Sequence, residues 1–158
     1  MKGKIKAYAV SILFTLAVGA VSAFLTRNNM DVYSNIQKPG AAPPGIVLPI
    51  VWTVLYILMG TGLANVIIKG REKGIYTMPA VYLYLLQLAV NFLWSLIFFN
   101  LQAFLFAFVW LLILWVLVGA MILKFHEISP FAAYINIPYF AWVTFAGYLN
   151  YMVYSLNA

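Results

Sequence analysis

The sequence contains no cysteine and very little charge. Without cysteine it forms no disulfide, no thiolate nucleophile and no cysteine-ligated metal cluster. Charged residues make up 8% of the chain, against roughly 25% in soluble domains. Hydrophobic residues make up 66% of it, more than the core of a soluble protein requires. The composition therefore indicates an integral membrane protein.

All charged residues lie outside five long apolar stretches. A helix that spans a bilayer needs about 20 apolar residues, and each stretch is about that long. The stretches do not alternate between apolar and polar residues, as a membrane β-barrel requires, so only helices fit. We therefore predict one all-α domain, residues 1–158, that forms a bundle of five transmembrane helices. Their expected ranges are 7–26, 47–68, 79–99, 103–123 and 130–155.

Proline and glycine mark the connections. Residues 27–46 include three prolines and two glycines between Gln37 and Gly45, which predicts an ordered lid, with a plain solvated linker as the alternative. Ser129 and Pro130 suit the N-cap and first residue of the fifth helix. Pro138 lies inside that predicted helix, where it removes one backbone hydrogen bond and should bend the helix.

The basic residues are distributed unevenly between the two ends of the predicted helices. Only Arg27 and Lys38 lie on one side, and the other seven lie on the opposite side. The positive-inside rule therefore predicts a multi-pass protein of the cell membrane, with the N-terminus cytoplasmic and the C-terminus outside. This distribution argues against a nucleic-acid partner. The first stretch also resembles a signal peptide that ends near Val21-Ser22-Ala23, but we expect an uncleaved helix.

The predicted helices carry no ionisable side chain that suits acid–base or metal chemistry. His126, the only histidine, is expected in a connection over residues 124–129 as an interfacial hydrogen-bonding residue. One histidine with the distant carboxylates Asp31 and Glu72 does not form a metal site, so we expect no bound metal. No charged or strongly basic side chain in the predicted helices can act as a general acid or base. An ion channel or proton-coupled pump is disfavoured, because such pathways place ionisable residues within the bilayer.

Three predicted helices present aromatic and amide side chains on one face. These residues recur at steps of three and four, the spacing of one helical face. They are Pro49, Trp52, Tyr56 and Met59; Gln87, Asn91, Trp94 and Ser95; and Trp142, Phe145, Ala146 and Leu149, with Asn150 adjacent. A buried amide needs a partner, so Gln87 and Asn91 should face either another helix or a cavity, and both alternatives stay open. Trp110, Trp115 and Tyr154 are expected to face lipid or the membrane interfaces.

Spaced motifs on these helices resemble the TspO/MBR family, the tryptophan-rich sensory and translocator proteins. The motifs are Gln37-Lys38-Pro39, Pro43-Pro44, Pro49-x-x-Trp52-x-x-x-Tyr56-x-x-Met59-Gly60, Asn91-x-x-Trp94-x-x-x-Phe98-Phe99 and Trp142-x-x-Phe145-Ala146-x-x-Leu149-Asn150-Tyr151. They occur in order and span nearly the whole chain. The resemblance implies a five-helix bundle, commonly a homodimer, that binds porphyrins such as protoporphyrin IX. For mitochondrial relatives the resemblance also implies binding of cholesterol and of synthetic benzodiazepine-type ligands. Some bacterial members are reported to promote light- and oxygen-dependent breakdown of porphyrin.

The resemblance also implies which residues bind the ligand. They are Tyr33, Trp52, Tyr56, Asn91, Trp94, Trp142, Phe145, Ala146 and Leu149. The family's cholesterol motif needs a Lys or Arg after its tyrosine, and residues 150–158 contain neither, so we do not expect sterol recognition through it. Gly19-x-x-x-Ala23 permits close helix approach, either between subunits or within one.

A cleft of aromatic rings suits a flat, apolar macrocycle. No His or Cys lies in the predicted helices to ligate haem iron, so metal-free protoporphyrin IX is the expected ligand or substrate and no cofactor is required. An excited porphyrin is an oxidant, which makes Trp52 and Trp142 candidate catalytic residues that donate electrons or trap a reactive product. A carrier of tetrapyrroles or sterols, and a sensor or scaffold that acts through a partner protein, are the alternatives.

Overall fold

The computed structural model describes residues 2–158, and the regular secondary structure in that range is helical. The long helices are α1 (Lys2–Thr26), α3 (Val47–Lys73), α4 (Met78–Ser95), α5 (Phe104–Ile128) and α7 (Ile137–Asn157). The short ones are η1 (Arg27–Asn29), α2 (Asp31–Asn35), η2 (Leu96–Asn100) and α6 (Pro130–Tyr134). Four helical stretches in residues 2–158 are long and apolar enough to cross a membrane: Lys2–Asn29, Val47–Lys73, Met78–Asn100 and Phe104–Ile128. This confirms an all-helical membrane bundle.

The fifth predicted helix is divided, so its prediction as a single helix over residues 130–155 is wrong. The chain leaves helical structure between α6 and α7, and Pro138 lies in the first turn of α7 rather than inside a bent helix. Proline is tolerated there because the first N–H groups of a helix have no intrahelical partner. Ser129 is an N-cap, as predicted: its hydroxyl oxygen accepts from the backbone N–H of Ala132 at 3.4 Å. The helix that it caps is the short α6.

Several helices extend beyond their apolar stretches. α1 begins at Lys2, α3 continues to Lys73, and α5 continues to Ile128, which places His126 in the last turn of α5 rather than in a connection. Charged side chains at helix ends extend toward water while the backbone stays helical. The connection over residues 27–46 is likewise not a simple loop, because it contains η1 and α2.

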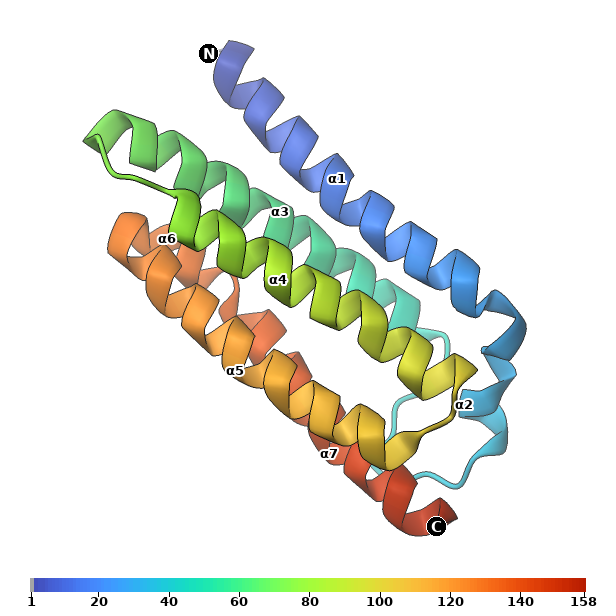
Figure 1. The fold of residues 1–158 in the computed structure, drawn as a ribbon. Coiled ribbons are helices and arrows are strands. Elements are labelled where there is room, and N and C mark those ends of the chain that lie inside the picture. The colour runs from blue at the N-terminus through green and yellow to red at the C-terminus, as the bar shows by residue number, and fades with distance from the viewer. Residues whose placement is uncertain (1) are drawn as a thin grey trace.

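The long helices lie side by side, and the two termini lie at opposite ends of the bundle (Figure 1). α2 and the connection between α4 and α5 lie at the same end as the C-terminus. α1 packs mainly on α3, and α5 packs on both α4 and α7. The α1–α3 contact is close at Gly60, where an added Cβ would lie 2.6 Å from the Cα of Ile12. Glycine at this position allows the two backbones to approach.

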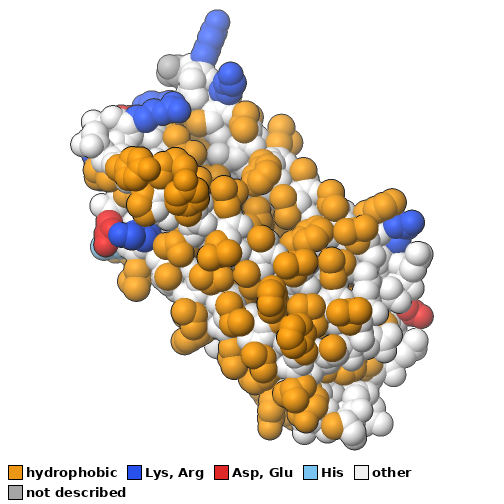
Figure 2. All heavy atoms as spheres, viewed as in Figure 1, with side chains coloured by type: hydrophobic (Ala, Val, Ile, Leu, Met, Phe, Trp, Pro, Cys, Tyr) orange, Lys and Arg blue, Asp and Glu red, His pale blue; other side chains and the backbone are white. Residues whose placement is uncertain are grey.

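The surface of the bundle is apolar along its length. Figure 2 shows hydrophobic side chains over the middle of the face in view and lysine and arginine side chains near its ends. Exposed apolar residues come from several helices, among them Leu13, Ile57, Leu86 and Val116. An apolar flank between charged ends matches a bilayer, whose hydrocarbon core excludes charge.

Candidate ligand-binding cavity

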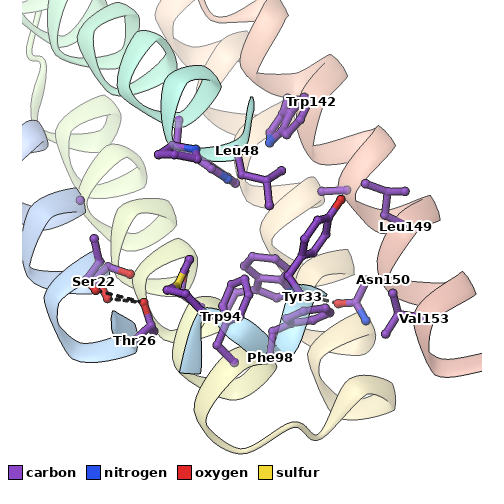
Figure 3. Close-up of a pocket in the computed structure, with 18 of the residues that line it drawn as sticks. Ser22, Thr26, Tyr33, Leu48, Trp94, Phe98, Trp142, Leu149, Asn150 and Val153 are labelled. Carbon is purple, nitrogen blue, oxygen red and sulfur yellow. Dashed lines mark hydrogen bonds between the residues drawn. The ribbon is translucent and has the colours of Figure 1, made fainter. Parts of the chain in front are cut away.

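A cavity of about 150 Å³ lies between α1, α3, α4–η2 and α7, at the end of the bundle covered by α2. Figure 3 shows side chains of separate helices around one space, with Trp142 and Leu48 on one side and Trp94 and Phe98 on the other. The lining is mainly aromatic and aliphatic, and none of its residues is charged. An uncharged aromatic site favours an apolar, planar guest.

Trp52 of α3 and Trp142 of α7 form one wall of the cavity. Their ring centroids are 6.4 Å apart and their planes are perpendicular, the edge-to-face arrangement that aromatic quadrupoles favour. Tyr56 extends this wall, with its ring 5.8 Å from that of Trp52. The indole N–H of Trp142 is buried and has no hydrogen-bond acceptor within residues 2–158. A buried donor without an acceptor is costly, which makes this N–H a candidate donor to a ligand.

Trp94 is held on the opposite wall by Asn150. The indole N–H of Trp94 donates to Asn150 Oδ1 at 3.0 Å, and Asn150 Nδ2 donates to the Phe104 carbonyl oxygen at 2.9 Å. One side-chain amide thus connects α4, α5 and α7. Asn150 lines the cavity, although helical spacing placed it only next to the face that carries Trp142 and Ala146.

The π-helical turn η2 adds two aromatic rings to the same wall. The Leu101 N–H donates to the Leu96 carbonyl oxygen at 3.0 Å, which is an i to i+5 bond. In a regular α-helix Phe98 would share a face with Trp94, and Phe99 would turn away. The wider turn lets both phenylalanines line the cavity, with their centroids 4.9 Å apart. π turns are frequent at functional sites.

The lid over residues 27–46 is closed by hydrogen bonds. The Tyr33 hydroxyl donates to the Pro43 carbonyl oxygen, and burial raises the pKa of the Tyr33 phenol above its ordinary value. Tyr33 therefore stays an uncharged donor at neutral pH. The Gln37 N–H donates to Asn157 Oδ1 at 3.1 Å, and Asn157 Nδ2 donates to the Gln37 carbonyl oxygen at 2.9 Å. These reciprocal bonds join the lid to the last turn of α7.

The structure brings seven of the nine predicted ligand-binding residues to this cavity. They are Tyr33, Trp52, Tyr56, Trp94, Trp142, Ala146 and Leu149. Asn91 and Phe145 are not among the lining residues. Phe145 is half-buried and packs between Trp142 and Tyr148 along α7, with centroid distances of 5.7 and 6.3 Å.

Asn91 and Gln87 join helices instead of facing the cavity. Asn91 Nδ2 donates to the Tyr139 hydroxyl at 2.8 Å, and that hydroxyl donates to Gln87 Oε1 at 2.6 Å. All three residues are buried. Of the two uses that the sequence left open for these amides, the structure shows the interhelical one. Tyr139, three residues before Trp142, was missed, although its spacing puts it on the same face of α7.

We predict that Tyr139→Phe destabilises the protein by about 1–2 kcal/mol. The substitution keeps the ring but leaves Gln87 Oε1 and Asn91 Nδ2 without their partner. Thermal unfolding in detergent would measure the effect. Tyr148→Phe is the matched control, because Tyr148 is exposed on the same helix. Equal stability of the two variants would contradict the importance of this network.

The sequence also did not predict that α1 forms part of the cavity wall. Gly19, Ser22, Ala23 and Thr26 line the cavity, and small residues alone give no signal for such a role. An added Cβ on Gly19 would lie 2.3 Å from Tyr56 Cε2. Gly19 therefore serves helix packing within one chain, one of the two uses that its spacing allowed.

Comparisons with known proteins identify the family of this chain. The tryptophan-rich protein TspO of Chlorobaculum tepidum is 37% identical over 158 residues, which is 99% of each chain. The tryptophan-rich sensory protein of Cereibacter sphaeroides is 31% identical over 152 residues, 95% of this chain and 92% of that relative. The translocator protein of Homo sapiens is 37% identical over 139 residues, 86% of this chain and 80% of that protein. The family model described as TspO/MBR family matches residues 11–155, and the chain belongs to this family.

Proposed function

We propose that the protein binds protoporphyrin IX, or a closely related metal-free tetrapyrrole, in the cavity beneath the lid. The observation that carries the proposal is the perpendicular pair of Trp52 and Trp142 on the wall of an uncharged cavity. The indole rings offer apolar faces and edges to a planar macrocycle. The buried N–H of Trp142 offers a donor to a ring nitrogen or carbonyl group of the ligand.

Binding of a macrocycle requires the lid to move. The cavity has a volume of about 150 Å³, and ligand sites usually have about 300–1,000 Å³. Few hydrogen bonds join the lid to α7 and η2, those of Gln37 with Asn157 and of Asn29 with Asn100. Opening these bonds would enlarge the site without disturbing the long helices.

A cavity-filling variant tests the proposal. Ala146 lines the cavity, so Ala146→Phe is expected to weaken binding of protoporphyrin IX by about tenfold, or about 1.4 kcal/mol. Titration in darkness, followed by quenching of tryptophan fluorescence and by the porphyrin absorbance, would measure the dissociation constant. Ala141→Phe is the control, because Ala141 is exposed on α7 and does not line the cavity. Absence of binding by the unmodified protein, or unchanged binding by Ala146→Phe, would refute this site.

Under light, the proposed activity is oxidation of the bound porphyrin. The excited ligand would take one electron from the indole of Trp52 or Trp142 and pass it to molecular oxygen, which gives superoxide and an indole radical cation. The indole radical cation would regain an electron from the porphyrin ring, and superoxide would add to the oxidised ring, so that one oxygen molecule is consumed and the indole is restored. The cavity lining holds no acid or base for conventional catalysis. The ligand would therefore carry most of the chemistry, and the protein would hold it next to two indoles that relay electrons.

A carrier is the second candidate function, and the name translocator protein of the Homo sapiens relative favours it. A carrier of tetrapyrroles or sterols would use the same cavity but release its ligand unchanged. Flux of protoporphyrin IX across reconstituted vesicles without loss of its absorbance would support it. A sensor that acts through a partner protein, a homodimer and benzodiazepine-type ligands are further expectations from the family.

The proposed placement is a multi-pass protein of the cell membrane in which α6 and α7 form the fifth crossing. The two termini lie at opposite ends of the bundle (Figure 1), as an odd number of crossings requires. Most basic residues lie at the end that carries the N-terminus, among them Lys4, Lys69 and Lys124, and the positive-inside rule makes this end cytoplasmic.

A further inference from the structure

The lid carries a half-buried cation without a counter-ion. Lys38 Nζ donates to the carbonyl oxygens of Tyr33 and Ile36, and it lies 4.8 Å from the centroid of the Tyr33 ring. No carboxylate in the described part of the chain comes within 4.0 Å of this ammonium, because the ion pairs there involve Lys4, Lys69 and Lys124. The charge of Lys38 is therefore balanced by two carbonyl dipoles and the face of the Tyr33 ring.

The carbonyl bonds account for only part of the bonding capacity of Lys38. An ammonium has three N–H donors, and two of them are used. The two acceptors belong to the end of α2 and the residue that follows it, where a lysine satisfies unpaired helix carbonyls. A lysine with only this structural role would need no further partner. The third donor, with the full positive charge, remains available in a partly desolvated position, where a carboxylate partner is worth more than in water.

Lys38 contacts Tyr33, which lines the cavity. The ring that its ammonium contacts lines the cavity, and Figure 3 shows Tyr33 among the lining side chains of the other helices. Arg27, which follows the lining residue Thr26, also has no carboxylate partner in residues 2–158 and donates to the Phe24 carbonyl oxygen at 2.6 Å. The only carboxylate side chain of the lid is Asp31. The lid therefore carries two cations and one carboxylate beside an uncharged cavity.

We propose that Lys38 binds the carboxylate of an amphipathic planar ligand whose ring lies among the tryptophans. This inference rests on the proposed function and narrows its ligand class to tetrapyrroles that keep free acid side chains. The ring of such a ligand occupies the apolar cavity, and its acid groups point to the lid. Flexible acid side chains on one edge of the ring allow a carboxylate to pass Tyr33 and reach the third N–H of Lys38. The ligand is therefore bound in one orientation.

The test compares protoporphyrin IX with its dimethyl ester, which has the same ring but no carboxylate. Dissociation constants are measured in darkness for the unmodified protein and for Lys38→Gln. We expect the unmodified protein to bind the diacid more tightly than the diester. In Lys38→Gln the ratio of the diester dissociation constant to the diacid one should fall about fivefold, which is about 1 kcal/mol. The affinity of Lys38→Gln for the diester should stay nearly unchanged. Comparing the two preferences cancels the different solubilities of the ligands in detergent.

Two controls separate charge recognition from lid structure. Lys38→Arg keeps the charge and should keep the preference, and Arg71→Gln removes an exposed cation at the other end of the bundle without effect. Equal weakening of diacid and diester by Lys38→Gln would assign Lys38 a structural role only and would overturn the inference. An unchanged preference would also overturn it. If neither porphyrin binds to the unmodified protein, the proposed function fails, and this inference fails with it.

Discussion

Replacing both Trp52 and Trp142 with phenylalanine is expected to slow the light-driven loss of bound protoporphyrin IX by about tenfold or more, which is about 1.4 kcal/mol in the barrier. Phenylalanine keeps an apolar ring on the wall but is a much poorer electron donor than indole. The perpendicular rings lie 6.4 Å apart, so both border the same part of the cavity. The decay of porphyrin absorbance under constant illumination measures the rate.

This experiment needs equal occupancy of the site. Each variant is illuminated at a porphyrin concentration that saturates it, as determined beforehand in darkness. Trp115→Phe is the matched control, because Trp115 is exposed on α5 and donates to Thr144 Oγ1 outside the cavity. If the double variant binds porphyrin and bleaches it at the unmodified rate, the indoles do not act as reductants.

Gly60→Ala is expected to destabilise the bundle by about 3 kcal/mol. The added Cβ would lie 2.6 Å from Ile12 Cα and 2.9 Å from Ile12 N, both backbone atoms that cannot rotate away. α1 and α3 would have to separate, and both helices contribute to the cavity wall. Thermal unfolding in detergent measures the loss of stability, and the porphyrin titration measures the loss of binding.

Gly119→Ala provides the comparison for this variant. A Cβ on Gly119 of α5 would meet Phe140 Cε2 at 3.5 Å, an ordinary contact. Alanine is favoured over glycine within helices by about 1 kcal/mol, so Gly119→Ala should be neutral or stabilising. If Gly60→Ala behaved in the same way, the close approach of α1 and α3 would not limit stability.

The sequence predicts the membrane bundle because every apolar stretch supports the same conclusion. A stretch without charge and of sufficient length has few alternatives to a spanning helix. The resemblance to the TspO/MBR family implied the cavity residues of α3 and α7. Helical spacing alone predicts that Trp52 and Tyr56 share a face, as do Trp142 and Ala146. These predictions required no knowledge of tertiary contacts.

Features that depend on tertiary partners could not be predicted in this way. Asn91 suits a cavity wall or an interhelical bond equally well, and only the position of Tyr139 decides between them. Pro138 fits both a bent helix and the first turn of a new one. Gly19 and the hydroxyl of Ser22 carry no signal that separates a cavity wall from ordinary packing. The π turn that positions Phe99 has no sequence signature of its own.

The reciprocal hydrogen bonds of Gln37 and Asn157 couple two parts of the chain that are far apart in sequence. Helix ends fray readily, because their last carbonyls lack intrahelical partners. Whenever the final turn of α7 frays, the lid loses its hydrogen bonds to α7 at the same moment. Under the proposed function, the residence time of a bound porphyrin would therefore depend on local unfolding at the end of α7, and a molecule that stabilises this helix end would slow ligand exchange.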